Sequence, residues 1–141
     1  NNNIVNHEDG IDDNETGTNA GISSFITSAQ FDLDDGHKFA FIQKVYPDVT
    51  FDGSTAESPT ATLSLFAAQN SGSGRNSPAS EGGTNTGSIT RTATAPIEAF
   101  TSRLDLRVRG RQLALKIESS ESGVKWQLGS PRLELRPDGR R

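Results

Sequence analysis

The stretch that decides the fold runs from Leu104 to Ile117. Its first half alternates apolar and charged side chains, as Leu104-Asp105-Leu106-Arg107-Val108-Arg109. After Gly110 the apolar side chains change from even to odd positions, at Leu113, Leu115 and Ile117. A period of two places successive side chains on opposite faces of a β-strand. The stretch therefore predicts two strands, joined at a glycine where a bulge shifts the parity of the inward-facing residues.

The same pattern continues toward the C-terminus. Residues 124–128 alternate around Trp126, and residues 133–135 alternate again after a break rich in Gly, Ser and Pro. We therefore expect an antiparallel four-stranded meander over residues 101–136, with one face on a core and the other facing water or a partner. Trp126 shares the phase of its apolar neighbours, which favours core packing over stacking against a ligand.

The upstream half contains further stretches that resemble strands. Phe, Ile, Val and Thr are frequent in four of them: 25–31, 38–46, 49–51 and 61–67. A Thr-rich stretch at 88–95 fits either an edge strand or an extended loop. No segment carries an apolar stripe of helical period. About eight short strands separated by turns predict an all-β fold, an antiparallel β-sandwich or jelly-roll-like domain with a long polar N-terminal arm.

The 141 residues have room for one core. Residues 1–23 are polar and read as an arm or linker, so residues 24–141 form a single antiparallel β domain with a long loop at 69–88. The sequence begins with Asn1 and contains no Met, from which we expect a piece of a longer protein. No apolar run approaches the roughly 20 residues of a membrane span.

Few residues are arranged for catalysis or metal binding. The chain has no Cys, which excludes disulfides, thiolate metal sites and a thiol nucleophile. The acidic cluster Asp32–Gly36 has its glycine one position too early for an EF-hand loop, which favours an acidic turn. The stretch Gly82–Gly87 is followed by Ser88 where a phosphate-binding loop needs Lys. His7 and His37 have no evident catalytic partners. We therefore expect no catalytic residue, no metal site, no cofactor and no enzymatic activity.

Charge is divided between the two halves of the chain. Residues 1–70 hold 11 acidic and 2 basic side chains, a net −9, whereas residues 71–141 hold 7 acidic and 12 basic side chains, a net +5. This division fits an interface between oppositely charged surfaces, although two solvated faces remain the alternative. Acidic residues interrupt the basic half, which disfavours tight DNA binding but allows DNA to pass nearby. The candidate interface residues are Arg103, Arg107, Arg109, Arg111, Arg132, Arg136, Arg140 and Arg141.

Several short motifs resemble the C-terminal region of tail nozzle proteins of short-tailed bacteriophages, which are also described as packaged-DNA stabilisation proteins. The resemblance covers residues 22–141. The motifs that carry it are Arg109-Gly110-Arg111-Gln112, Trp126-Gln127-Leu128-Gly129, Arg132 with the ending Pro137-Asp138-Gly139-Arg140-Arg141, Asp35-Gly36 with Phe39, and Pro47-Asp48-Val49-Thr50-Phe51.

The resemblance implies a structural protein of the virion in the bacteriophage tail. It implies copies of the chain in a ring, expected to be hexameric, with neighbouring tail and portal-adaptor proteins as partners. Double-stranded DNA would pass transiently through the lumen, and no membrane would be contacted in the assembled state. The resemblance supplies no catalytic residues. In such a particle we expect residues 1–23 and 69–88 to extend across neighbouring copies.

An alternative function is a carbohydrate-binding or adhesin-type β-sandwich module. Such a module needs an exposed aromatic side chain as a platform for sugar rings. Because Trp126 is expected to point inward, Tyr46 is the main candidate, which makes this reading weaker than the structural one.

Overall fold

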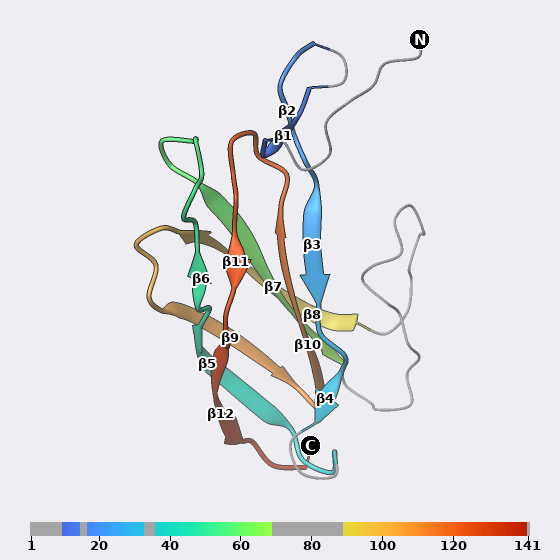
Figure 1. The fold of residues 1–141 in the computed structure, drawn as a ribbon. Coiled ribbons are helices and arrows are strands. Elements are labelled where there is room, and N and C mark those ends of the chain that lie inside the picture. The colour runs from blue at the N-terminus through green and yellow to red at the C-terminus, as the bar shows by residue number, and fades with distance from the viewer. Residues whose placement is uncertain (1–9, 15–16, 33–35, 69–88, 141) are drawn as a thin grey trace.

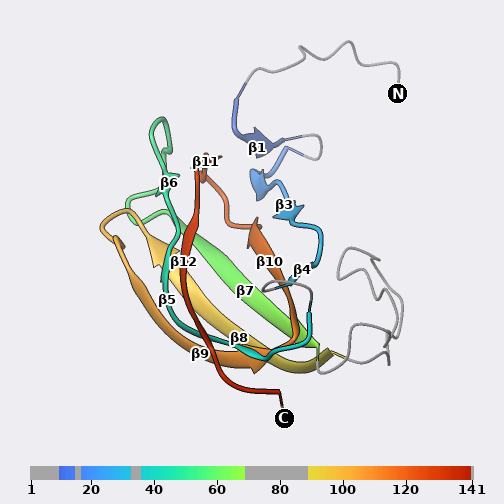
Figure 2. The same ribbon diagram turned by 90° about the horizontal axis from the view of Figure 1, so that it is seen from below.

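The structure is a computed structural model that describes residues 10–14, 17–32, 36–68 and 89–140. Within these residues it contains twelve β-strands and no helix. Two antiparallel sheets face one another, and two short ladders extend from them (Figures 1 and 2). The expected all-β sandwich is confirmed. Most strands of both sheets form in the stretches where the alternation of apolar residues predicted them.

The larger sheet has the strand order β3-β10-β7-β8, and β4 also pairs with β10. Its strands are β3 (Ser24–Thr27), β4 (Phe31–Asp32), β7 (Thr60–Ala68), β8 (Ile89–Glu98) and β10 (Gln112–Ser119). The smaller sheet has the order β12-β5-β9. Its strands are β5 (Ala40–Tyr46), β9 (Leu104–Gly110) and β12 (Arg132–Pro137). A two-stranded ladder of β6 (Val49–Thr50) and β11 (Gln127–Leu128) follows the β5 and β12 pair.

The core lies between the two sheets. Alternate residues of the central strands are fully buried, among them Leu63 and Leu65 on β7, Leu113 on β10 and Ile42 on β5. Trp126 is partly buried and packs against this cluster, so its inward orientation is confirmed. Its indole Nε1–H donates a hydrogen bond of 2.9 Å to Ser24 Oγ, which ties the segment before β11 to β3.

The expected meander over residues 101–136 is wrong. Strand β9 pairs with β5, β10 pairs with β7, β11 pairs with β6, and β12 pairs with β5, so no two consecutive strands of this region are neighbours. The alternation of apolar residues correctly indicated which face of each strand is inward. The alternation carries no information about the neighbouring strand, and here each successive strand from β9 to β12 lies in a different sheet or ladder from the strand before it.

The chain changes sheets at Gly110 and Arg111. Gly110 pairs with Ala40 in the smaller sheet, whereas the Arg111 N–H donates to the Ala68 carbonyl at 2.9 Å in the larger one. The parity of inward residues shifts here as expected. Glycine is required here because the backbone at residue 110 passes close to Ala67, and not because of an unusual backbone angle. A Cβ at residue 110 would lie 2.8 Å from the Cβ of Ala67.

Three other predicted strands differ in extent. The stretch 25–31 is split into β3 and β4, because the Ser28 hydroxyl takes the place of a backbone carbonyl and accepts the Leu115 N–H at 2.9 Å. Only Gln127–Leu128 of the stretch 124–128 forms a strand. The Thr-rich stretch 88–95 is an edge strand, β8, which extends to Glu98.

Part of the predicted polar arm is described. Strand β1 (Asp12–Asp13) pairs with β2 (Ala20–Gly21). The Asp12 carboxylate accepts hydrogen bonds from the Gly123 N–H at 2.6 Å and from the Ser122 hydroxyl at 3.0 Å. The arm is thus joined to the turn after β10. The rest of the arm, residues 1–9, and the expected loop at 69–88 lie outside the described residues, as do the glycine-rich stretch 82–87 and His7.

Candidate functional site

The arginines of the Arg109-Gly110-Arg111 motif contact the C-terminal segment. Arg109 Nε lies 2.5 Å from Asp138 Oδ2, and its Nη2 donates to the Asp138 carbonyl at 2.9 Å. Arg111 Nη2 donates to the Arg140 carbonyl at 2.8 Å. Both guanidinium groups also lie over the ring of Phe39, at 3.9 and 4.8 Å from its centre. Arg109 and Arg111 therefore hold their own chain end in place.

Other candidate arginines lie on the outer face of the β12-β5-β9 sheet. In register across it, Arg136, Phe41 and Arg109 form one row, and Arg136 lies over the Phe41 ring at 4.9 Å. The next row of outward-facing side chains along this sheet consists of Glu134, Lys44 and Asp105. In it the Lys44 ammonium pairs with the Glu134 carboxylate at 3.5 Å. The interleaved carboxylates make this face mixed in charge, which suits a protein partner better than a phosphate backbone.

The eight candidate arginines thus separate into groups. Arg109 and Arg111 are half-buried, while Arg107, Arg132, Arg136 and Arg140 are exposed. Arg103 pairs with Asp105 at 3.3 Å on the surface. Arg141 lies outside the described residues.

Five of the positively charged side chains that the structure describes lie at one end of the molecule. We define the basic end as the described residues Lys38, Arg109, Arg111, Arg136 and Arg140 together with Asp32 and Asp138, which carry a net +3. These residues surround the start of β5, the end of β12 and the start of β10, near the C-terminus at the bottom of Figure 1. Asp32 joins the group because its Oδ2 accepts a bond of 3.5 Å from Gln112 Nε2.

Five of the negatively charged side chains that the structure describes lie at the other end. We define the acidic end as the described residues Asp12, Asp13, Asp52, Glu57 and Glu121 together with Lys125, which carry a net −4. Three segments meet there: the β1-β2 hairpin, the β6-β7 connection and the turn after β10, all at the top of Figure 1. The Gly123 carbonyl joins two of them by accepting the N–H groups of Thr55 and Ala56 at 2.9 and 3.0 Å.

The two ends are held apart by the length of the strands. Strand β10 begins at Gln112, in the basic end, and finishes at Ser119, beside the acidic end. At about 3.4 Å per residue, its 8 residues separate the ends by roughly 27 Å. This exceeds the Debye length of about 8 Å at physiological salt, so each end presents its own charge to an approaching molecule.

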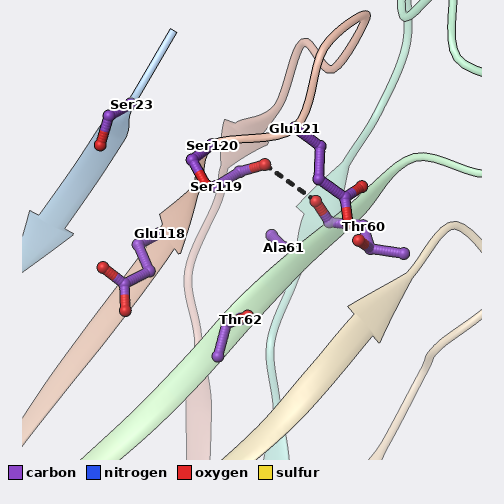
Figure 3. A pocket seen from close by; sticks show the side chains of 8 residues that line it. All are labelled: Ser23, Thr60, Ala61, Thr62, Glu118, Ser119, Ser120 and Glu121. Atoms are coloured by element: carbon purple, nitrogen blue, oxygen red, sulfur yellow. Dashed lines mark hydrogen bonds between the residues drawn. The ribbon is translucent and has the colours of Figure 1, made fainter. Parts of the chain in front are cut away.

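A shallow polar hollow of about 220 Å³ lies next to the acidic end (Figure 3). It is lined by Ser23, Thr60, Ala61, Thr62, Glu118, Ser119, Ser120 and Glu121. The Ser119 hydroxyl is committed to the Thr60 carbonyl at 3.0 Å, and Glu118 pairs with Lys116 at 2.6 Å. The hollow therefore adds hydroxyls and a carboxylate to the acidic surface, and two of its side chains, Ser119 and Glu118, are bonded to the protein itself.

Two further observations concern the described part of the chain. It holds no group of three or more His, Asp or Glu residues that could bind a metal ion. It also holds no helix that could cross a membrane. Of the acidic cluster Asp32–Gly36, the structure describes Asp32 and Gly36, and Gly36 has a positive φ of 76° that fits the expected turn.

No family model, no curated protein and no solved structure matches this chain.

Sequence reasoning did not identify the exposed apolar residues. Phe100 is 82% exposed in the connection between β8 and β9, and Ile22, Phe25 and Ile26 are about half-exposed along β3. Tyr46, the expected aromatic platform, is 37% exposed at the end of β5. A signal for the β3 group was present in the sequence, because residues 22–30 contain no charged side chain.

Proposed function

We propose that the protein is a structural subunit whose copies join through oppositely charged ends, as a part of the tail nozzle ring of a bacteriophage virion. The observation that carries this proposal is the separation of a net −4 and a net +3 charge to opposite ends of one sandwich. Nothing in this role requires catalysis. It requires shape, stable packing and complementary surfaces.

The charge arrangement favours one kind of contact. Two acidic ends repel each other, as do two basic ends, whereas an acidic end attracts the basic end of the next copy. Such a contact is heterologous, because it joins two different surfaces of the same molecule. Heterologous contacts close into a ring if the rotation between copies permits it, and otherwise grow as a filament.

The placement of two resemblance motifs supports the same proposal. Residues 109–112 and 137–140 are 25 or more positions apart in sequence, yet they meet at the basic end through Arg109, Asp138, Arg111 and Arg140. The motifs thus act as one structural unit at a surface. The ring, the adjoining tail and portal-adaptor proteins, and the DNA passing along its axis are parts of the proposal that rest on the resemblance.

The test is the mass of the purified chain by sedimentation or light scattering at different salt concentrations. We expect assemblies larger than a dimer in about 50 mM NaCl and their loss in about 0.5 M NaCl, where screening reduces the attraction. Double reversal of the basic end, R136E/R140E, and of the acidic end, E57K/E121K, should each prevent these larger assemblies.

Mixing these two variants gives the sharpest result. Each keeps one intact end, so the mixture should recover association that neither variant shows alone. R107E/R132E is the matched control, because it changes the charge by the same amount on the sheet face away from the ends. Assemblies larger than a dimer that survive both end reversals would refute the proposal. Electron microscopy of the intact particle would then test the position in the tail.

A sugar-binding module is a second candidate, which the position of Tyr46 favours. Tyr46 faces outward at the end of β5, opposite Arg132 in the ladder with β12. An aromatic ring beside a hydrogen-bond donor is an arrangement that could hold a sugar. Titration of the protein with oligosaccharides, compared with Tyr46→Ala, would test it, and equal responses of the two proteins would exclude it.

A further inference from the structure

A group of exposed apolar side chains lies at one margin of the larger sheet. Ile22, Phe25 and Ile26 are 53%, 43% and 48% exposed, and they fall within five residues on and just before β3. Figure 1 shows β3 along the right side of the molecule. Exposed hydrophobic residues scattered singly are ordinary, but three together on a sheet edge mark a contact surface.

The edge of β3 lacks the usual protection. In the described residues no strand pairs with its outer side. Strand β12, at an edge of the smaller sheet, carries Arg132, Glu134 and Arg136 on alternate positions and ends at Pro137. Charges and proline on an edge discourage the addition of another strand. Residues 22–30 contain neither a charge nor a proline.

Both faces of the sheet are uncovered at this margin. Ile26 is opposite Ile117 in the ladder and so faces the core side, yet it is half-exposed. Phe25 is opposite Glu118 and faces the outer side, where its ring lies 5.2 Å from the Lys116 ammonium. The bond from Trp126 to Ser24 fixes the strand from the core side. The edge is therefore preformed, with an apolar side chain available above and below it.

We propose that β3 pairs in antiparallel fashion with β3 of a second copy of this chain, about a two-fold axis. The pairing would continue the larger sheet across the dimer by strand addition. Phe25 would lie directly opposite Phe25 of the partner on the outer side, and Ile22 and Ile26 would be diagonal neighbours of the partner's isoleucines on the core side. Such a contact is isologous, because both copies use the same surface.

Charge complementarity favours a second copy as the occupant. Strand β3 begins at Ser24, opposite Ser119 near the acidic end, and the chain reaches Phe31, opposite Leu113, near the basic end. In an antiparallel pair, the acidic end of each copy therefore lies alongside the basic end of the other. The uncharged residues 22–30 of the two copies meet without repulsion. The acidic end of each copy attracts the basic end of the other.

The contact is independent of the end-to-end contact proposed above, and high salt separates the two. Backbone hydrogen bonds and apolar burial are not screened, so the intact chain in about 0.5 M NaCl should have twice its 15.1 kDa mass by sedimentation equilibrium. Phe25→Lys and Ile26→Lys should each raise the dimer dissociation constant by about tenfold or more, because they bring like charges together across the axis.

Phe100→Lys is the matched control, since it adds the same charge at a more exposed apolar residue away from β3. It should leave the dimer unchanged. Circular dichroism and the fluorescence of Trp126, the only tryptophan, confirm that each variant is folded. A monomeric wild-type chain in high salt, growth beyond a dimer, or equal dissociation by all three lysine variants would overturn the proposal.

A second measurement does not depend on mass. The chain has no cysteine, so a single introduced thiol forms a disulfide only with the same position of another copy. Phe25→Cys should give a covalent dimer under mild oxidation, because Phe25 lies directly opposite itself in the proposed register. Thr94→Cys, on the outer face of β8, should remain monomeric. Equal crosslinking at both positions would indicate random collision and refute the paired register.

Discussion

The carboxylate of Asp48 faces the backbone of Gly129 across the break between the β5-β12 and β6-β11 ladders. Asp48 Oδ2 accepts the N–H of Ser130 at 2.6 Å, and the Asp48 carbonyl accepts the N–H of Gly129 at 2.8 Å. Asp48 has a φ of 49°, in the left-handed region. A Cβ on residue 129 would overlap the carboxylate. The two residues therefore fix the kink between the ladders together.

Gly129→Ala should destabilise the fold, because the added methyl group displaces the Asp48 carboxylate from Ser130. We expect a loss of about 1 to 2 kcal/mol in the free energy of unfolding, measured by chemical denaturation. Combining it with Asp48→Gly should cost less than the sum of the single changes, since the glycine removes the overlapping group and accepts a positive φ. Additive effects would show that the two residues are not coupled.

Gly110→Ala should be more harmful, because its neighbour Ala67 is fully buried. The new Cβ would lie 2.8 Å from the Cβ of Ala67 and 3.1 Å from the Ala68 carbonyl oxygen. Overpacking of this kind costs about 1 to 3 kcal/mol. Ala67→Gly in the same chain should recover part of the loss, as measured by a double-mutant cycle in urea. A cycle with no coupling energy would contradict this account of the sheet change.

Arg109→Lys should loosen the C-terminal segment. Lysine keeps the positive charge but loses the fork that reaches both the Asp138 carboxylate and its carbonyl. Because Arg109 is partly exposed, we expect a global cost of only about 0.5 to 1 kcal/mol. The sensitive measurement is amide exchange at Phe39 and Asp138, whose backbones are joined in this region. Faster exchange there, with β7 unchanged as the internal control, is the expected result.

Trp126→Phe and Ser24→Ala should have non-additive effects, because both remove the same 2.9 Å hydrogen bond. Each should cost about 1 kcal/mol in unfolding free energy, because Ser24→Ala leaves the partly buried indole N–H without its acceptor. The double variant should cost little more than Trp126→Phe alone. A double variant that costs the full sum would mean that the bond contributes nothing.

The sequence allowed the faces of the strands to be predicted, but not their neighbours. Leu106 and Val108 before Gly110, and Leu113 and Ile117 after it, are buried as their alternation indicated. Which strand lies beside β9 depends on contacts with β5, whose paired residues are 59 (Val45 and Leu104) to 70 (Ala40 and Gly110) positions away in the chain. The run before β11 failed to extend because Gly123 bonds to Thr55 and Ala56 instead of continuing a ladder.

The sequence predicted that the two halves of the chain differ in charge, but not where in the fold the charged residues lie. The two halves of the chain differ in charge by simple addition. That these charges occupy opposite ends follows only from the course of β5 and β10, which both start in the basic end. The contacts of Arg109 with Phe39 and Asp138 could not be predicted from the sequence. The residues around each of the three give no indication that they meet in the fold.

The separation of paired strands along the chain has a consequence during synthesis. Strand β3 finds its partner only when β10 has been made, about 90 residues later. At typical rates of translation this delay is roughly 5 to 18 s. During this delay the uncharged residues 22–30, with the large apolar side chains Ile22, Phe25 and Ile26, have no strand to pair with. We therefore expect nascent chains to need a chaperone at this stretch, and slow folding in its absence.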